Sequence, residues 1–322
     1  TTTFIFFSIS RPLFNFNFYS QSYVSFFFNF TFNQTFNFFS IEIFPPKTAK
    51  GMEKLKTTLE AFKSCTPDYI SVTYGAGGTS RENTHELAAH IHHDLDVPAM
   101  AHLTCVAHTV EEIDVVLSNL KNSEITNVMA LRGDPTAGTK HFVQPKGGYH
   151  YASELITAIR EHSDFGIGAA GYPEGHLENP DKDDDRKHLH EKIAAGAEFI
   201  VTQFFLENTH FLRWRDQLRR EGASVPLVAG ILPPANWKAT KHMSEMCGVS
   251  IPEDLAQALI KNETDPEASR EIGFDHVENQ FEELLQEGVE GVHLYALNQL
   301  STVEHLGPIL KDASGTISTP HL

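Results

Sequence analysis

Beyond residue 39, short apolar runs alternate with longer segments in which apolar residues recur every three or four positions. Short apolar runs predict buried strands, and a period near 3.6 predicts amphipathic helices. The predicted strands are 41–44, 69–74, 99–105, 127–131, 165–170, 198–203, 227–232 and 291–295. The predicted helices are 52–63, 82–94, 110–120, 152–162, a helix from about 183, 209–221, helical segments through 237–286, and 303–310.

Eight strand-then-helix units favour a parallel barrel covered by helices, the α/β fold known as the (β/α)8 or TIM-type barrel. A doubly wound sheet uses the same units and is the competing fold. The barrel is favoured because the count reaches eight and because polar or glycine residues follow the strands throughout. In a barrel those positions converge on one rim. We therefore expect a single domain over residues 40–312 and a short tail over 313–322.

Residues 1–39 have a different composition. They hold 14 of the 24 phenylalanines and one charged residue, Arg11. Asn and Ser interrupt every apolar stretch and the start is not basic, so the segment does not resemble a signal peptide. We expect an aromatic-rich, low-complexity, non-globular segment, either disordered or non-native, outside the barrel.

The charge balance and the cysteines limit the classes of partner. The chain has 42 acidic and 25 basic residues and a net charge of −17, which disfavours nucleic acid and anionic membranes as partners. Its three cysteines show no CxxC spacing, which indicates a reducing compartment. No charge-free apolar run reaches the roughly 20 residues of a transmembrane helix. We expect a cytoplasmic protein with small-molecule partners.

Chemically capable residues cluster at the ends of the predicted strands. They are Glu42, Thr73, His102, Arg132, Gly133, Asp134, Tyr172, Gln203 and Tyr295. A carboxylate within a dry strand is costly without partners, so Glu42 is either half of a structural ion pair or a general acid whose pKa is raised by burial. Asp134 is either a ligand-binding residue or a turn residue before a proline. His102 is either a site residue or a core histidine.

Two further patterns carry less weight. The run Gly75-Ala-Gly-Gly78 follows a strand but is not a G-x-G-x-x-G fingerprint, so a Rossmann dinucleotide site is not supported. His90, His92 and His93 lie on one predicted helix, where positions i and i+2 point in different directions. We therefore expect no metal site.

Together, eight ordered segments resemble the methylenetetrahydrofolate reductase family. They are Ser40-Ile-Glu-Ile-Phe-Pro-Pro-Lys-Thr48, Ser71-Val-Thr-Tyr-Gly-Ala76, Ala101-His-Leu-Thr-Cys105, Ala130-Leu-Arg-Gly-Asp134, Ala170-Gly-Tyr-Pro-Glu174, Ala195-Gly-Ala-Glu-Phe-Ile-Val-Thr-Gln-Phe-Phe205, Gly230-Ile-Leu-Pro233 and His293-Leu-Tyr-Ala-Leu-Asn298. The resemblance covers about residues 40–310 and is to the short form that holds only the catalytic barrel. It implies reduction of 5,10-methylenetetrahydrofolate to 5-methyltetrahydrofolate in one-carbon and methionine metabolism. FAD would be the bound cofactor, and NADH or NADPH the electron donor in a ping-pong hydride transfer.

The resemblance also implies roles for individual residues. Glu42 would be the general acid that protonates the folate nitrogen N10, and Asp134 would act beside flavin and folate. The implied flavin-binding residues are Thr73, Tyr74, Ala76, His102, Arg132, Gly133, Asp134, Tyr151, Ala152, Tyr172, His176, Asp185, His188 and Lys192. The implied folate-binding residues are Glu42, Asp134, Gln203, Tyr295 and Gln299. Relatives are often homo-oligomers, although no interface can be identified from this sequence.

Two alternatives to the reductase stay open, one from a departure from the family pattern and one from relatedness of fold. Family members commonly have an arginine where this chain has Gln299, which keeps a hydrogen bond and loses the charge. One alternative is a degenerate barrel that binds flavin or folate without turnover. The other is a different flavoenzyme barrel, such as a proline dehydrogenase-like enzyme. The presence of Glu42, Asp134 and Gln203 favours the reductase.

Overall fold

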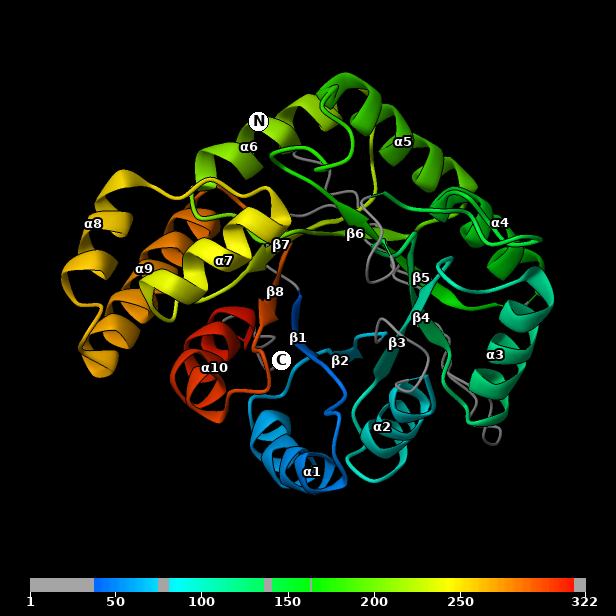
Figure 1. The fold of residues 1–322 in the computed structure, drawn as a ribbon, viewed down its shortest axis with the longest axis horizontal. Helices are drawn as coiled ribbons and strands as arrows, with labels where there is room; N and C mark the ends of the chain where they lie inside the picture. The colour runs from blue at the N-terminus through cyan, green and yellow to red at the C-terminus, as the bar shows by residue number, and fades with distance from the viewer. Residues whose placement is uncertain (1–37, 75–80, 136–140, 163, 316–322) are drawn as a thin grey trace, which may run out of the picture.

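Eight parallel strands close into a barrel in chain order, with β1 beside β8 (Figure 1). The computed structural model describes residues 38–74, 81–135, 141–162 and 164–315. The strands are β1 (Phe39–Ile43), β2 (Tyr69–Val72), β3 (Ala99–Thr104), β4 (Asn127–Leu131), β5 (Gly166–Gly171), β6 (Phe199–Thr202), β7 (Leu227–Ile231) and β8 (Gly291–Tyr295). The predicted single-domain (β/α)8 fold is confirmed.

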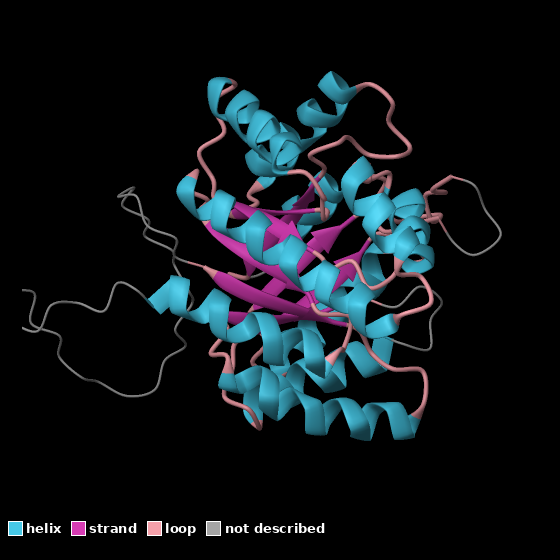
Figure 2. Cartoon of the chain, turned by 90° about the vertical axis from the view of Figure 1, so that its left-hand side faces the viewer, coloured by secondary structure: helices cyan, strands magenta, loops and turns pink. Residues whose placement is uncertain are grey.

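Helices surround the barrel on its outer side (Figures 1 and 2). They are α1 (Ala49–Ser64), α2 (Arg81–His93), α3 (Val110–Asn122), α4 (Ala152–His162), α5 (Lys182–Ala195), α6 (Asn208–Arg220), α7 (Trp237–Cys247), α8 (Glu253–Lys261), α9 (Pro266–Gln286) and α10 (Leu300–Gly315). The predicted helical stretch 237–286 forms three helices, because Gly248 ends α7 in a left-handed conformation and Pro266 starts α9 after its cap. No helix in the described ranges is long and apolar enough to span a bilayer.

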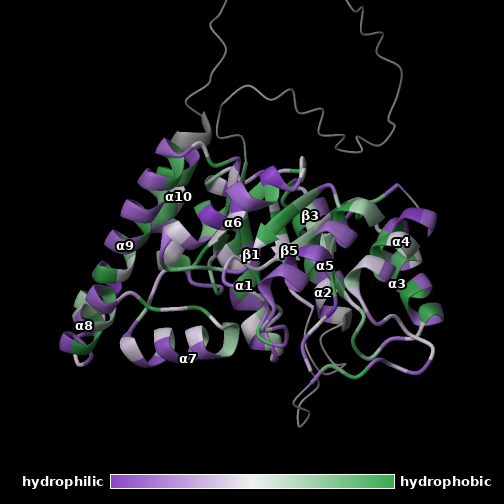
Figure 3. Cartoon of the chain, turned by 90° about the horizontal axis from the view of Figure 1, so that it is seen from above, coloured by the Kyte–Doolittle hydropathy of each residue, from purple (hydrophilic) through white to green (hydrophobic). Residues whose placement is uncertain are grey.

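The strands are apolar because both of their faces are buried, one against the helices and one in the barrel interior. Every residue of β2, β3, β6 and β7 is buried, and the strands at the centre of Figure 3 are mainly hydrophobic. In β1, the apolar residues Phe39, Ile41 and Ile43 pack in the main core with the helices. Ser40 and Glu42 alternate with them and therefore face the barrel interior. This alternation places a carboxylate inside the barrel.

The barrel begins slightly earlier than the composition indicates. Phe39 is the first residue of β1 and is fully buried. Phe38 packs with Tyr69 and Phe199 at the amino-terminal end of the barrel, and its carbonyl accepts a hydrogen bond from the Val292 backbone at 2.8 Å. The last two residues of the predicted segment 1–39 thus belong to the folded domain. Residues 1–37 lie outside the described part of the chain.

We expect Phe39→Ala to lower the free energy of unfolding by about 3–5 kcal/mol, because it removes a fully buried aromatic side chain. The matched control is Phe44→Ala, since Phe44 is 43% exposed and its loss should cost about 1 kcal/mol or less. Urea unfolding of both variants measures the difference. Equal effects would show that Phe39 is not part of the core.

Candidate functional site

A cavity of ≈ 300 Å³ lies at the carboxyl ends of the strands, and we call it the rim cavity. It is lined by Glu42, Thr73, Tyr74, His102, Thr104, Val106, Met129, Leu131, Arg132, Gly133, Asp134, Ala170, Tyr172, His176, Val201, Gln203 and Tyr295. Closure of the barrel therefore brings Glu42, Asp134 and Gln203 to one cavity, although they come from three distant parts of the chain.

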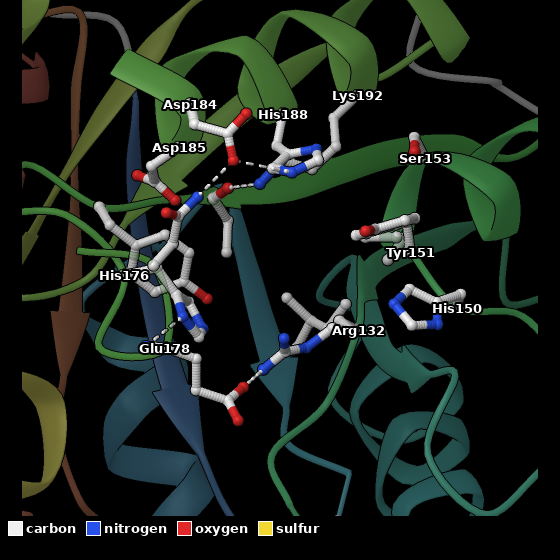
Figure 4. A pocket seen from close by; sticks show the side chains of 16 residues that line it. Arg132, His150, Tyr151, Ser153, His176, Glu178, Asp184, Asp185, His188 and Lys192 are labelled. Atoms are coloured by element: carbon white, nitrogen blue, oxygen red, sulfur yellow. Dashed lines mark hydrogen bonds and ion pairs between the residues drawn. The ribbon is translucent and has the colours of Figure 1, made fainter. Parts of the chain in front are cut away.

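A second cavity of ≈ 340 Å³ adjoins the rim cavity, and we call it the flank cavity (Figure 4). Its lining is Ala130, Leu131, Arg132, His150, Tyr151, Ala152, Ser153, Ala170, Tyr172, His176, Glu178, Asn179, Asp184, Asp185, His188 and Lys192. Arg132, Tyr172 and His176 line both cavities. The residues that the family resemblance assigns to flavin are thus divided between two connected spaces.

One of the predicted residues that the structure describes, Gln299, is not found in these cavities. Gln299 is exposed, lines neither cavity and donates its backbone N–H to the Ala296 carbonyl at 2.8 Å. Its contact with folate remains a prediction. Ala76 lies outside the described residues.

Glu42 is held between two histidines from other strands. Its Oε2 lies 3.4 Å from Nε2 of His102 on β3 and 3.4 Å from Nε2 of His293 on β8. Nδ1 of His293 lies 2.7 Å from the Ser40 hydroxyl, and Ser40 is also His293's partner in the β1–β8 register. His293 is only 1% exposed. The carboxylate therefore has a fixed partner that is in turn held by a hydroxyl group.

The predicted rise in the pKa of Glu42 is wrong, because the net shift of this pKa is downward. Burial does act to raise it, but the hydrogen bond from His293 and the charges of His102 and His293 outweigh burial and hold the pKa below its ordinary value. Burial in turn lowers the pKa of His102. Glu42 is therefore ionised at neutral pH. The two histidines are 60 and 251 residues away in sequence, so the residues around Glu42 gave no sign of them.

The flank cavity contains two cationic side chains. Lys192 donates to the Ala170 carbonyl at 2.6 Å, and burial lowers the pKa of Lys192 to about 8, against the opposing charge of Asp185. Arg132 is paired with Glu178, as the dashed line in Figure 4 shows. A half-buried lysine and an arginine in the lining of one cavity form a site suited to a ligand with negative charge.

Helix α5 presents three of the flank-cavity residues on one face. Asp185, His188 and Lys192 are spaced i, i+3 and i+7, so they project from the same side of the helix. Asp181 caps α5 by accepting from two backbone N–H groups of the first turn. The ring of His188 stacks on Tyr151, with centroids 5.0 Å apart and an interplanar angle of 24°. The wall therefore joins charged groups with a flat aromatic surface.

No role is predicted from the sequence for His293, Ser40 or Glu178. His293 could have been found, because it precedes Tyr295 by two residues in β8 and so shares its side of the strand. Ser40 stands in the same relation to Glu42 in β1. Glu178 lies in a loop, and nothing in its local sequence marks it as the partner of Arg132.

Comparison with known proteins identifies relatives over most of the chain. Residues 29–310 match the sequence model of the methylenetetrahydrofolate reductase family, and this match begins within the aromatic-rich segment. The Schizosaccharomyces pombe protein "Methylenetetrahydrofolate reductase 1" is 35% identical over 288 residues, which cover 87% of this chain and 48% of that protein. The Escherichia coli (strain K12) "5,10-methylenetetrahydrofolate reductase" is 35% identical over 260 residues, which cover 81% of this chain and 86% of that protein.

A solved structure shows the same fold at low identity. It is an uncharacterized protein from Clostridium thermocellum that binds two copies of 5-methyl-5,6,7,8-tetrahydrofolic acid. It matches with a TM-score of 0.58 and 16% identity over 88% of this chain and 97% of its own.

This chain spans about half the length of the first curated relatives that it matches, at 46–48% of each. The family match and the sequence identities lead to one conclusion: the chain belongs to the methylenetetrahydrofolate reductase family.

Proposed function

We propose that this protein reduces 5,10-methylenetetrahydrofolate to 5-methyltetrahydrofolate, with FAD bound in the rim and flank cavities and NADH or NADPH as the electron donor. The observation that carries the proposal is the convergence of Glu42, Asp134 and Gln203 on the rim cavity. Membership of the family supports the same chemistry. The proposal includes a cytoplasmic location, because the three cysteines are unpaired, as a reducing compartment requires.

The residues of the two cavities fit FAD. In the flank cavity, Lys192 and Arg132 suit the negative phosphates. In the rim cavity, Gly133 has φ of +88°, and a Cβ there would lie 2.8 Å from Val106 Cγ1, so this position in the cavity lining requires glycine. Nε2 of His102 is buried and lies 3.4 Å from the Glu42 carboxylate, but it makes no hydrogen bond within the described residues, so a bound ligand would complete its hydrogen bonding. When bound, FAD would accept hydride from the nicotinamide and transfer it to the one-carbon unit of folate.

The protein's own part in this chemistry is to supply a proton. Opening the five-membered ring of the substrate requires a proton on N10, because an amine is a poor leaving group without one. Glu42 is ionised before substrate binds, so it must take up a proton before it can deliver one to N10. We assign the relay of that proton to His293, whose Nε2 lies 3.4 Å from Glu42 Oε2. Glu42 would then pass the proton to N10. Bound substrate would exclude water from the Glu42 carboxylate. This further burial raises the pKa of the carboxyl group and so favours proton transfer to Glu42.

Three other rim residues have supporting roles in the proposal. Asp134 is exposed at the rim, where its negative charge favours the cationic iminium form of the substrate. The Gln203 side-chain oxygen accepts from the Phe204 backbone at 3.0 Å, which leaves its amide N–H groups for the pterin. The Tyr295 hydroxyl donates to the Thr202 carbonyl at 2.7 Å, so its ring is a fixed wall.

The second candidate is a barrel that binds flavin or folate without turnover. The feature that favours it is Gln299, where relatives commonly have arginine. Gln299 lines neither cavity, so the substitution leaves the lining of the rim cavity intact. Family membership also favours the folate reductase over a proline dehydrogenase-like enzyme.

Glu42→Gln should leave flavin reduction by NAD(P)H nearly unchanged and slow folate reduction by about 10²- to 10⁴-fold, because only the second half-reaction needs the proton. Anaerobic stopped-flow absorbance of the yellow protein measures both half-reactions. Glu60→Gln, at an exposed position on α1, is the matched control. Equal losses in both half-reactions would refute the assignment, and a wild-type protein that folate cannot reoxidise would favour the non-catalytic barrel.

His293→Asn keeps a hydrogen-bond donor beside Glu42 and removes the imidazole, whose two nitrogens can relay a proton. We expect slower folate reduction and flavin reduction that is unaffected, because only folate reduction needs the relayed proton. His141→Asn is the control, since the His141 side chain is 82% exposed. Folate reduction at the wild-type rate in the His293 variant would show that the proton comes from another group.

FAD affinity should fall as pH rises through about 8, because Lys192 then loses its charge and the phosphates lose a partner. Where only the charged form binds, the dissociation constant rises by about tenfold per pH unit above that value. Fluorescence titration of apoprotein measures it. Lys192→Gln should bind weakly and show little pH dependence in this range, whereas Lys187→Gln, at an exposed position on the same helix, should match the wild type. The same pH dependence in Lys192→Gln would contradict the assignment.

A further inference from the structure

Two elements on the outer side of the barrel bring His92, His93 and Glu124 together. His92 and His93 end helix α2, and Glu124 lies in the turn between α3 and β4. The imidazole nitrogens and a carboxylate oxygen of these residues all lie within 4.8 Å of one another. Among the described residues, this is the group of histidine, cysteine and acidic side chains with donor atoms close enough to share one ion.

The hydrogen bond that His93 makes through Nε2 leaves Nδ1 as the nitrogen that can bind a metal. Its Nε2 lies 3.1 Å from the Ser123 carbonyl, which can only accept, so Nε2 carries the proton and donates it. Nδ1 then has the lone pair. A backbone carbonyl behind the second ring nitrogen is the usual arrangement of a metal-binding histidine, because it fixes the tautomer and the ring orientation.

The distance from His93 to Glu124 also suits a shared ion better than a direct contact. His93 Nδ1 lies 3.9 Å from Glu124 Oε2, which is too far for a hydrogen bond. Two ligands about 2.0 Å from a tetrahedral zinc ion are about 3.3 Å apart. Both side chains are about half exposed, at 44% and 51%, so they can close this gap without disturbing the core.

The surroundings are favourable to a cation. The carboxyl end of α2 carries the negative end of the helix dipole. Asp96 follows that end and acts electrostatically on His92. Two imidazoles with one carboxylate are the ligand types that zinc takes, whereas Mg²⁺ and Ca²⁺ prefer oxygen ligands alone.

We propose that His92, His93 and Glu124 form a binding site for Zn²⁺ or a chemically similar divalent transition-metal ion. Residue spacing on the helix did not predict this site for two reasons. The third ligand, Glu124, comes from a separate turn, and the two histidines that converge, His92 and His93, are adjacent in sequence. The ends of α2 and α3 lead into the starts of β3 and β4, so the site lies at the end of the barrel opposite the rim cavity. A bound ion would cross-link α2 to the α3–β4 turn and stabilise the barrel.

Isothermal titration of the tag-free, chelator-treated full chain with ZnCl₂, with thermal unfolding in parallel, tests the site. We expect one ion per chain and a rise in Tm on addition of zinc. Glu124→Gln and His93→Ala should each weaken binding by at least about tenfold, since each removes a ligand. Glu124→Gln changes only an exposed carboxylate to an amide, which keeps the fold intact.

The control is His141→Ala, which removes an exposed histidine elsewhere and should bind zinc like the wild type. Magnesium chloride should give no heat. The proposal is overturned if zinc does not bind at millimolar concentration, if all three variants bind it equally, or if magnesium binds as well as zinc.

Discussion

The pairing of β1 with β8 is the contact on which the site depends. It closes the barrel in a register that sets Ser40 opposite His293 and Glu42 opposite Tyr295. An ionised carboxylate that is 18% exposed is costly unless charged or hydrogen-bonding partners offset its desolvation. The two histidines offset it here, and one of them is supplied by the closing strand. The fold and the chemistry of Glu42 are therefore determined by the same contact.

The two cavities are joined through the ends of β4 and β5. Arg132 follows β4 and Tyr172 follows β5, and both side chains line both spaces. The surrounding structure holds this junction in place. Ser250, in the turn between α7 and α8, donates its hydroxyl to Glu174 at 2.6 Å, which ties that turn to the loop after β5. Sites on such rigid supports keep reacting groups in position without further ordering on binding.

The sequence was sufficient for the fold and for much of the lining of the site. The period of the apolar residues located every strand to within about two residues, because buried parallel strands and amphipathic helices have distinct patterns. The polar residues after strands converge because barrel closure puts all eight carboxyl ends on one rim. The family resemblance implied a role for Lys192, which lines the flank cavity and which spacing alone would not have selected.

What could not be predicted depends on contacts between distant residues. The ionisation of Glu42 is set by His102 and His293, which only closure of the barrel places beside it. Phe39 was grouped with the aromatic-rich segment because composition does not show where a strand begins. The proximity of Glu124 to the histidines at the end of α2 is likewise a property of tertiary structure.

The most direct measurement is a crystal structure of the chain with FAD bound. The account predicts that the isoalloxazine ring lies in the rim cavity within contact of His102 and Gly133, with the Glu42 carboxylate facing the adjacent substrate space and still held by His293. The phosphates should lie in the flank cavity near Lys192. A flavin bound outside these two cavities, or a Glu42 carboxylate turned away from the rim, would contradict the account.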